Sequence, residues 1–287
     1  DIAEVLSGEQ VISFILQAEC DLLWNGGIGT YVKSRSESNA EVNDGANDAV
    51  RVNADQLRCR VVGEGGNLGF TQRARIEFAQ RGGLINTDAI DNSGGVDLSD
   101  HEVNFKILFS TIMQGGELDR DTRDQLLLKI ANGVCNKVLT HNDSQALSLT
   151  LGVVRSARRL DYLKEIIRDL SRLGYVDRSL EELPDDDVLD SRIQNKESLT
   201  RPELAICIAS VKRWLKDLLT SSDLLGDAVL QKSLEQYFPA QIVDRYRTYI
   251  HRHPLARDII ATEVVNQFID NMGASFVHRM QVNTCLL

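Results

Sequence analysis

Residues 59–106 decide the fold, and they read CRVVGEGGNLGFTQRARIEFAQRGGLINTDAIDNSGGVDLSDHEVNFK. The pattern predicts a strand, a glycine-rich turn and a helix, followed by a short strand, a second glycine-rich turn and another helix that begins at Ser99. Two such turns about 30 residues apart usually lie at the same end of a sheet, where open α/β folds bind their ligands. We therefore expect a binding site at these turns.

The residues before this stretch continue the same pattern. Residues 8–19 carry apolar side chains at helical spacing, and residues 20–24 (CDLLW) form an apolar strand that ends at Asn25-Gly26-Gly27. Residues 33–52 are polar and have no apolar period, so they are either a solvated excursion or a lid beside the site. Helix, strand and glycine turn in this order are half of a doubly wound unit.

After residue 117 the strand patterns vanish. Helices are expected at 120–141, 144–173, 201–220, 223–237, 240–250 and 254–280. The expected fold is therefore α/β plus all-α, with a partial doubly wound sheet in residues 1–115 and a helical domain in residues 116–287.

Composition excludes several classes of function. The net charge of −10 argues against a nucleic-acid groove or an anionic membrane surface, and no apolar run is long enough to span a bilayer. The five cysteines are scattered and never form a CxxC pair, which favours reduced thiols and a cytoplasmic protein. His251 and His253 lack partners at metal spacing, so we expect no metal site.

The two glycine turns each carry a candidate polar residue. A dinucleotide fingerprint starting at Gly63 fails, because Leu68 stands where the third glycine is needed. Asn67 is either a turn residue or a group beside a cofactor, and Asn92 is either an Asx-turn residue or a ligand for an amide or carboxylate. Ser99, with glutamate three residues later, forms a capping box, although a serine at a helix N-terminus can also hold an anion.

Two spaced landmarks resemble the glutamate dehydrogenase superfamily. They are residues 64–67 (EGGN) followed by Thr71, and residues 92–96 (NSGGV) followed by Ser99. The sequences of residues 24–33 (WNGGIGTYVK) and 95–104 (GVDLSDHEVN) are similar to those of the very large NAD-specific bacterial members of this superfamily. The resemblance covers nearly the whole chain.

The resemblance implies roles for individual residues. It implies that residues 1–115 are the C-terminal part of a Rossmann-like NAD-binding domain. Asn67 is then expected near the nicotinamide ribose, with Gly26 and Gly27 lining the cofactor. Asn92 is expected between cofactor and substrate, and Ser99 at the substrate's side-chain carboxylate.

The implied reaction converts L-glutamate, NAD and water to 2-oxoglutarate, ammonium and NADH, in a cytoplasmic homo-oligomer. Nothing in the chain resembles the glycine-rich segment that carries the catalytic lysine, so we expect a fragment that contains no catalytic residue and is inactive alone. Two alternatives stay open. The chain could belong to a dehydrogenase of another amino acid, or it could be a non-catalytic helical module for assembly or regulation.

Overall fold

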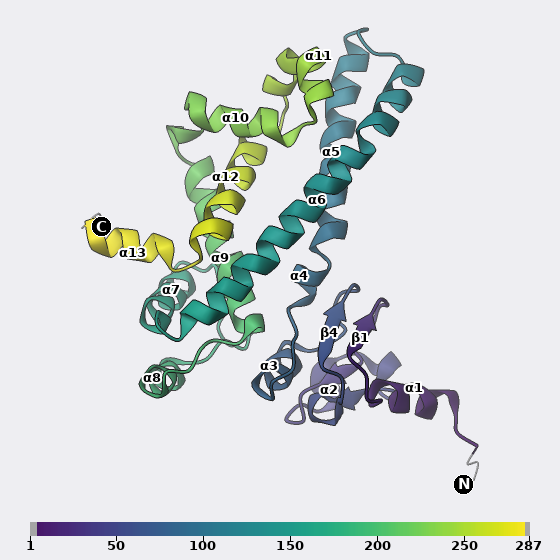
Figure 1. Cartoon of the computed structure of the whole chain (residues 1–287), viewed down its shortest axis with the longest axis vertical. Helices are drawn as coiled ribbons and strands as arrows, with labels where there is room; N and C mark the ends of the chain where they lie inside the picture. The colour runs from purple at the N-terminus through teal and green to yellow at the C-terminus, as the bar shows by residue number, and fades with distance from the viewer. Residues whose placement is uncertain (1–4, 285–287) are drawn as a thin grey trace. The chain divides into compact units, whose positions relative to one another are not determined.

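The computed structural model describes residues 5–284, and it is mostly helical with a few short strands near the N-terminus (Figure 1). No helix within these residues combines the length and the apolar character needed to cross a membrane. The elements in chain order are α1 (Gly8–Leu16), β1 (Leu22–Asn25), β2 (Val32–Lys33), α2 (Asn39–Val42), η1 (Gly45–Asn47), β3 (Val52–Asn53), η2 (Ala54–Gln56), β4 (Val61–Glu64), α3 (Gln72–Gln80), α4 (Asp88–Asp91), α5 (Ser93–Gln114), α6 (Arg120–Ser156), α7 (Leu160–Arg172), α8 (Asp186–Asn195), α9 (Arg201–Thr220), η3 (Asp223–Gly226), α10 (Ala228–Tyr237), α11 (Ala240–His251), α12 (Ala256–Met272) and α13 (Phe276–Thr284).

The strands form two parallel pairs. In the first pair β1 lies beside β4, with Leu22 opposite Val61 and Asn25 opposite Glu64. In the second pair β2 lies beside β3. The strand expected at residues 84–87 is reduced to Leu84, which makes an isolated parallel bridge to Val61. Because β1 and β4 are parallel and in register, the turns that follow them leave the same end of the pair.

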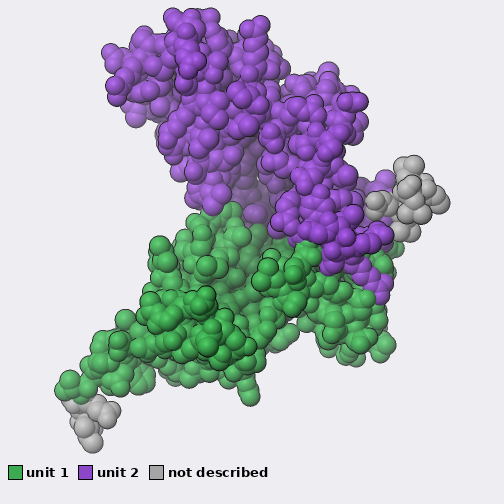
Figure 2. All heavy atoms as spheres, turned by 180° about the vertical axis from the view of Figure 1, so that it is seen from behind, with its two compact units in different colours: residues 1–93, 149–167, 176–207 green, residues 94–148, 168–175, 208–287 purple. Residues whose placement is uncertain are grey.

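The chain divides into two compact units (Figure 2). Unit 1 comprises residues 1–93, 149–167 and 176–207, and unit 2 comprises residues 94–148, 168–175 and 208–287. The units therefore alternate along the chain. The expected division into two domains, residues 1–115 and 116–287, stays a prediction.

Each unit has its own apolar core. In unit 1, Phe70 and Ala74 are buried beside the strands, and α3 contributes Phe78. In unit 2, aromatic rings of α5 pack together, with the Phe105 and Phe109 centroids 5.8 Å apart. The other buried residues of the unit 2 core include Leu108, Ile112, Ile130, Val134, Val138, Leu234, Phe238, Ile242, Ile250 and Ile260.

Several expected helix boundaries are wrong. The break expected between residues 141 and 144 is absent, because α6 runs without interruption through this polar segment. Polar residues alone do not end a helix when neither glycine nor proline follows them. The single helix expected at 254–280 is instead divided into α12 and α13 at Gly273, whose φ of 81° lies outside the helical region.

The prediction of a second glycine-rich turn is also wrong. Residues 93–96 are helical, and α5 begins at Ser93 rather than at Ser99. A Cβ atom built on Gly94 would lie 3.7 Å from the Asn142 side chain, so α5 and α6 run close together there. Glycine costs only about 1 kcal/mol inside a helix, so two adjacent glycines do not by themselves prevent one.

Candidate functional site

The turns after β1 and β4 touch through their backbones. The Gly66 N–H donates to the carbonyl of Asn25 over 3.0 Å. A Cβ atom on Gly66 would lie only 2.4 Å from the carbonyl oxygen of Gly27, whereas one on Gly27 would have no neighbour within 4 Å. Gly66 is therefore needed for the close approach, while Gly27 and its exposed neighbour Gly26 leave open backbone at the carboxyl end of the strands.

Trp24 covers the glycines of the neighbouring strand. It pairs with Gly63 across the two strands, and a Cβ atom on Gly63 or Gly65 would lie 2.6 Å or 2.4 Å from its indole ring. The residue nevertheless remains 60% exposed. The ring therefore packs on glycines without being buried.

Two of the predicted site residues come together. The side-chain nitrogen Nδ2 of Asn92 donates to Oδ1 of Asn67 over 3.0 Å. Asn67 is exposed in the turn after β4, and Asn92 is half-buried at the C-terminal end of α4. An amide carries two donors and one acceptor oxygen, so the pair can still offer the Asn67 amide nitrogen and the Asn92 oxygen to a ligand.

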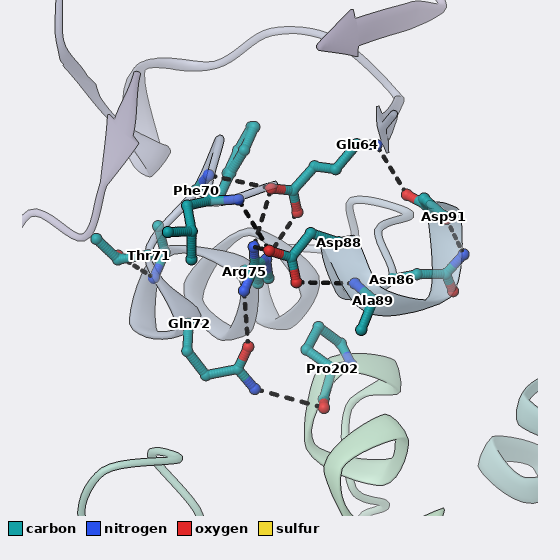
Figure 3. Close-up of polar contacts among 12 residues, drawn as sticks. Glu64, Phe70, Thr71, Gln72, Arg75, Asn86, Asp88, Ala89, Asp91 and Pro202 are labelled. Carbon is teal, nitrogen blue, oxygen red and sulfur yellow. Dashed lines mark hydrogen bonds and ion pairs between the residues drawn. The ribbon is translucent and has the colours of Figure 1, made fainter. Parts of the chain in front are cut away.

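A buried ion pair lies beneath this turn (Figure 3). Arg75 of α3 donates from Nε and Nη2 to the two carboxylate oxygens of Glu64, over 2.7 Å and 2.9 Å. Glu64 is 0% exposed and Arg75 is 5% exposed. Nη2 of Arg75 also lies 3.2 Å from the carboxylate of Asp88. Burial opposes the charge of Arg75, but the Glu64 and Asp88 carboxylates outweigh it and raise the pKa of the guanidinium.

The same acidic groups bind the backbone of the turn. Glu64 Oε1 accepts from the Phe70 N–H over 3.1 Å, and Asp88 Oδ2 accepts from the Leu68 N–H over 2.8 Å. Asp91 accepts from the Glu64 N–H over 2.9 Å, which joins α4 to the end of β4 (Figure 3). Both ends of the 64–69 turn are therefore held by carboxylates, and Asn67 projects from the middle.

These supporting residues were not predicted as part of the site. The signal in the sequence was weak: an acidic residue at the end of an apolar strand and an arginine within the next helix, Glu64 and Arg75. Only the fold places them together. A fully buried carboxylate needs a cationic partner, but the burial of Glu64 and the choice of Arg75 become apparent only in the folded structure.

Residues 33–52 are folded within unit 1. Arg51 donates from Nε to the Thr30 carbonyl over 2.8 Å, and the Thr30 N–H donates to Asp44 over 2.8 Å. Val42 lines a cavity of about 450 Å³, together with Leu68 and Asp88 of the site. This segment therefore borders the space beside the turn, and a role as a lid stays a prediction.

Ser99 is placed differently from the other predicted residues. It is exposed within α5 and belongs to unit 2, whereas Gly26, Gly27, Asn67 and Asn92 belong to unit 1. Because the helix begins six residues earlier, the serine hydroxyl does not cap it. The expected role of Ser99 at a substrate carboxylate stays a prediction, but it no longer rests on a helix N-terminus.

Comparison with known proteins gives two matches to family models. Residues 2–152 match the model described as bacterial NAD-glutamate dehydrogenase, catalytic domain, and residues 196–286 match glutamate dehydrogenase, C-terminal. Three proteins named NAD-specific glutamate dehydrogenase are similar to the chain. Those of Halomonas elongata and Pseudomonas aeruginosa are 44% identical over 97% and 98% of it, and that of Mycobacterium tuberculosis is 42% identical over 97%. The chain spans 17% of the length of each relative.

Proposed function

The chain belongs to the bacterial NAD-glutamate dehydrogenase family, and from this premise we propose that it supplies the nicotinamide side of an NAD-dependent glutamate dehydrogenase site. The overall reaction takes L-glutamate, NAD and water to 2-oxoglutarate, ammonium and NADH. When bound, NAD accepts a hydride from the α-carbon of the amino acid. The task of the residues in this chain is to position the two reactants.

One observation carries the proposal. Asn67, whose amide pairs with that of Asn92, directly follows Gly66, and the Gly66 backbone closely approaches that of Gly27 at the carboxyl end of two parallel strands. This is the end at which open α/β sheets bind dinucleotides, and bare glycine backbone allows a flat ring to approach closely. The residues thus fit a nicotinamide ribose.

Membership of the family implies a separate role for each of these residues. Asn67 binds the ribose, Gly26 and Gly27 line the cofactor, and Asn92 contacts both cofactor and substrate. The Ser99 hydroxyl donates a hydrogen bond to the side-chain carboxylate of glutamate. The buried Glu64–Arg75 pair fixes the turn from which Asn67 projects, so it has a positioning role.

The wider setting is also a proposal. We infer that unit 1 contains the C-terminal part of a Rossmann-like domain, which the parallel β1–β4 pair supports. The free cysteines Cys20, Cys59, Cys135 and Cys207 support a reducing, cytoplasmic compartment. Several apolar side chains on α1 are exposed, among them Phe14 and Ile15, each 61% exposed. Such a surface supports contact with further protein, and we infer that a second subunit of a homo-oligomer provides it.

The test uses the longer protein that contains this segment. We expect glutamate-dependent formation of NADH, measured at steady state. Asn67→Ala should raise KM for NAD about two- to tenfold, the change expected from the loss of one hydrogen bond. Ser99→Val should instead raise KM for glutamate. Asn195→Ala changes an exposed asparagine on α8 and serves as the matched control.

The outcomes separate the candidates. Absence of glutamate-dependent NAD reduction by the longer protein would contradict the proposed reaction. Unchanged glutamate use in Ser99→Val, combined with activity on an apolar amino acid, would instead favour a dehydrogenase of another amino acid. The 287-residue chain alone is expected to give no turnover, and steady NADH production from it would show that its own residues complete the chemistry.

A further inference from the structure

Three side chains of unit 2, none of them assigned a role above, converge between α5 and α6. Asp97 and His101 are four residues apart and therefore share a face of α5, and His141 reaches them from α6. Nδ1 of His141 lies 2.7 Å from Oδ2 of Asp97, and Nε2 of His101 lies 3.6 Å from Oδ1 of the same carboxylate. One ligand atom from each residue falls within 4.8 Å of the other two.

The buried histidine lacks an explanation within the protein. His101 is 1% exposed, and neither ring nitrogen has a hydrogen-bond partner among the described residues. The 3.6 Å separation from Asp97 is too long for a hydrogen bond. The ring stacks on Tyr237 with centroids 4.3 Å apart, so its position is fixed by packing. A buried polar atom without a partner calls for a water or an ion.

The chemistry of the three side chains suits a metal ion. An imidazole binds a metal through the lone pair of one ring nitrogen, and a carboxylate binds it through an oxygen.

We propose that Asp97, His101 and His141 bind a divalent transition-metal ion of the Zn²⁺ class. Two imidazoles and one carboxylate are a common ligand set for Zn²⁺, whereas Mg²⁺ and Ca²⁺ prefer oxygen ligands alone. Zinc–ligand bonds of about 2.0–2.1 Å put neighbouring ligand atoms a little over 3 Å apart, so ligand atoms that now lie up to 4.8 Å apart must approach by about 1–2 Å. The ion would connect α5 to α6. The proposal is independent of the proposed dehydrogenase function, since it uses none of the same residues.

The experiment titrates the 287-residue chain, freed of metal by a chelator, with Co²⁺. We expect one equivalent of Co²⁺ to produce visible d–d absorption, and Zn²⁺ to abolish it by displacement. His141→Asn should weaken binding at least about tenfold, because even outer-shell changes cost a metal site that much. His251→Asn is the matched control, since this histidine also belongs to unit 2, is partly exposed and lies 2.8 Å from a carboxylate, that of Glu235.

Folding is checked separately. His141 is partly exposed, so its replacement is expected to leave the far-UV circular dichroism unchanged. Zn²⁺ should raise the Tm of the unsubstituted chain and of His251→Asn, but not that of folded His141→Asn. Absence of saturable Co²⁺ binding, or equal binding by His141→Asn, would show that the three residues form only a hydrogen-bonded clamp, and the proposal would be overturned.

Discussion

Replacing Arg75 with methionine removes the cation beneath the 64–69 turn while keeping much of the side-chain volume. Glu64 is 0% exposed, so its carboxylate would be left buried without the two hydrogen bonds it receives from the guanidinium. Asp88 would lose the same partner at 3.2 Å. Removing one partner from a buried ion pair costs about 3–5 kcal/mol, and we expect Arg75→Met to reach the upper part of that range because two carboxylates lose the cation.

A second substitution sets the order of effects. Glu64→Gln keeps the shape of the acid, and it leaves Arg75 beside Asp88. We therefore expect a smaller loss, about 1.5–3 kcal/mol, which is the value of hydrogen bonds to a charged group. The double substitution should cost less than the sum of the two, because the residues share one interaction.

Urea unfolding followed by tryptophan fluorescence measures these losses. The chain has two tryptophans, Trp24 and Trp214, so a Trp214→Phe background makes the signal specific to Trp24 on the turn glycines. Arg60→Met is the matched control. Its partner Asp21 is likewise 3.2 Å away, but both side chains are more than 80% exposed, at 81% and 88%, so the midpoint should not move. A cost for Arg75→Met below that of Glu64→Gln, or under about 1 kcal/mol, would refute the assignment of the ion pair as the support of the turn.

Three further changes test other parts of the structure. Gly66→Ala should lower the free energy of unfolding by about 1–3 kcal/mol through its clash with the Gly27 carbonyl, whereas Gly27→Ala, with open space around it, should be tolerated; equal costs would contradict the close approach. Burial lowers the pKa of His253, so as the pH falls the unfolded state is protonated before the folded state. The free energy of unfolding should therefore decline as the pH falls below 6.5, the ordinary pKa of histidine. In His253→Gln the urea midpoint should depend less on pH, and an unchanged pH dependence would contradict this role of His253. Tyr237→Phe removes a hydroxyl that accepts from Asn104 over 2.9 Å and donates to Asp100 over 2.8 Å. It should cost about 1–3 kcal/mol in thermal unfolding, and an unchanged Tm would contradict this.

The first glycine turn was predictable from the sequence because its determinants are local. One apolar run leads to Asn25 and a second leads to Gly63. A glycine-rich turn follows each run, and each run forms a strand. The contact between Asn67 and Asn92 was not predicted, although both residues were expected at the same site. The prediction of Asn92 was therefore useful even though the segment after it is a helix.

Ser99 shows where local patterns were insufficient. A serine followed three residues later by glutamate reads as a capping box, but the pattern does not exclude a helix that has already begun. The helix starts at Ser93. The Glu64–Arg75 pair shows the complementary limit, because the two residues are eleven apart and their partner Asp88 is on another helix, so only tertiary structure brings the three charges together.

The alternation of the two units along the chain has a consequence for biosynthesis. Unit 1 begins at the N-terminal strands but is completed only by residues 149–167 and 176–207. At about 5–20 residues per second, a ribosome needs on the order of ten seconds to translate the residues between 93 and 207. During that interval the strands and the glycine turn lack residues 149–167 and 176–207 of their unit. Nascent-chain stalls placed shortly after residue 93 should therefore remain protease-sensitive, and protection should first appear when residue 207 has emerged.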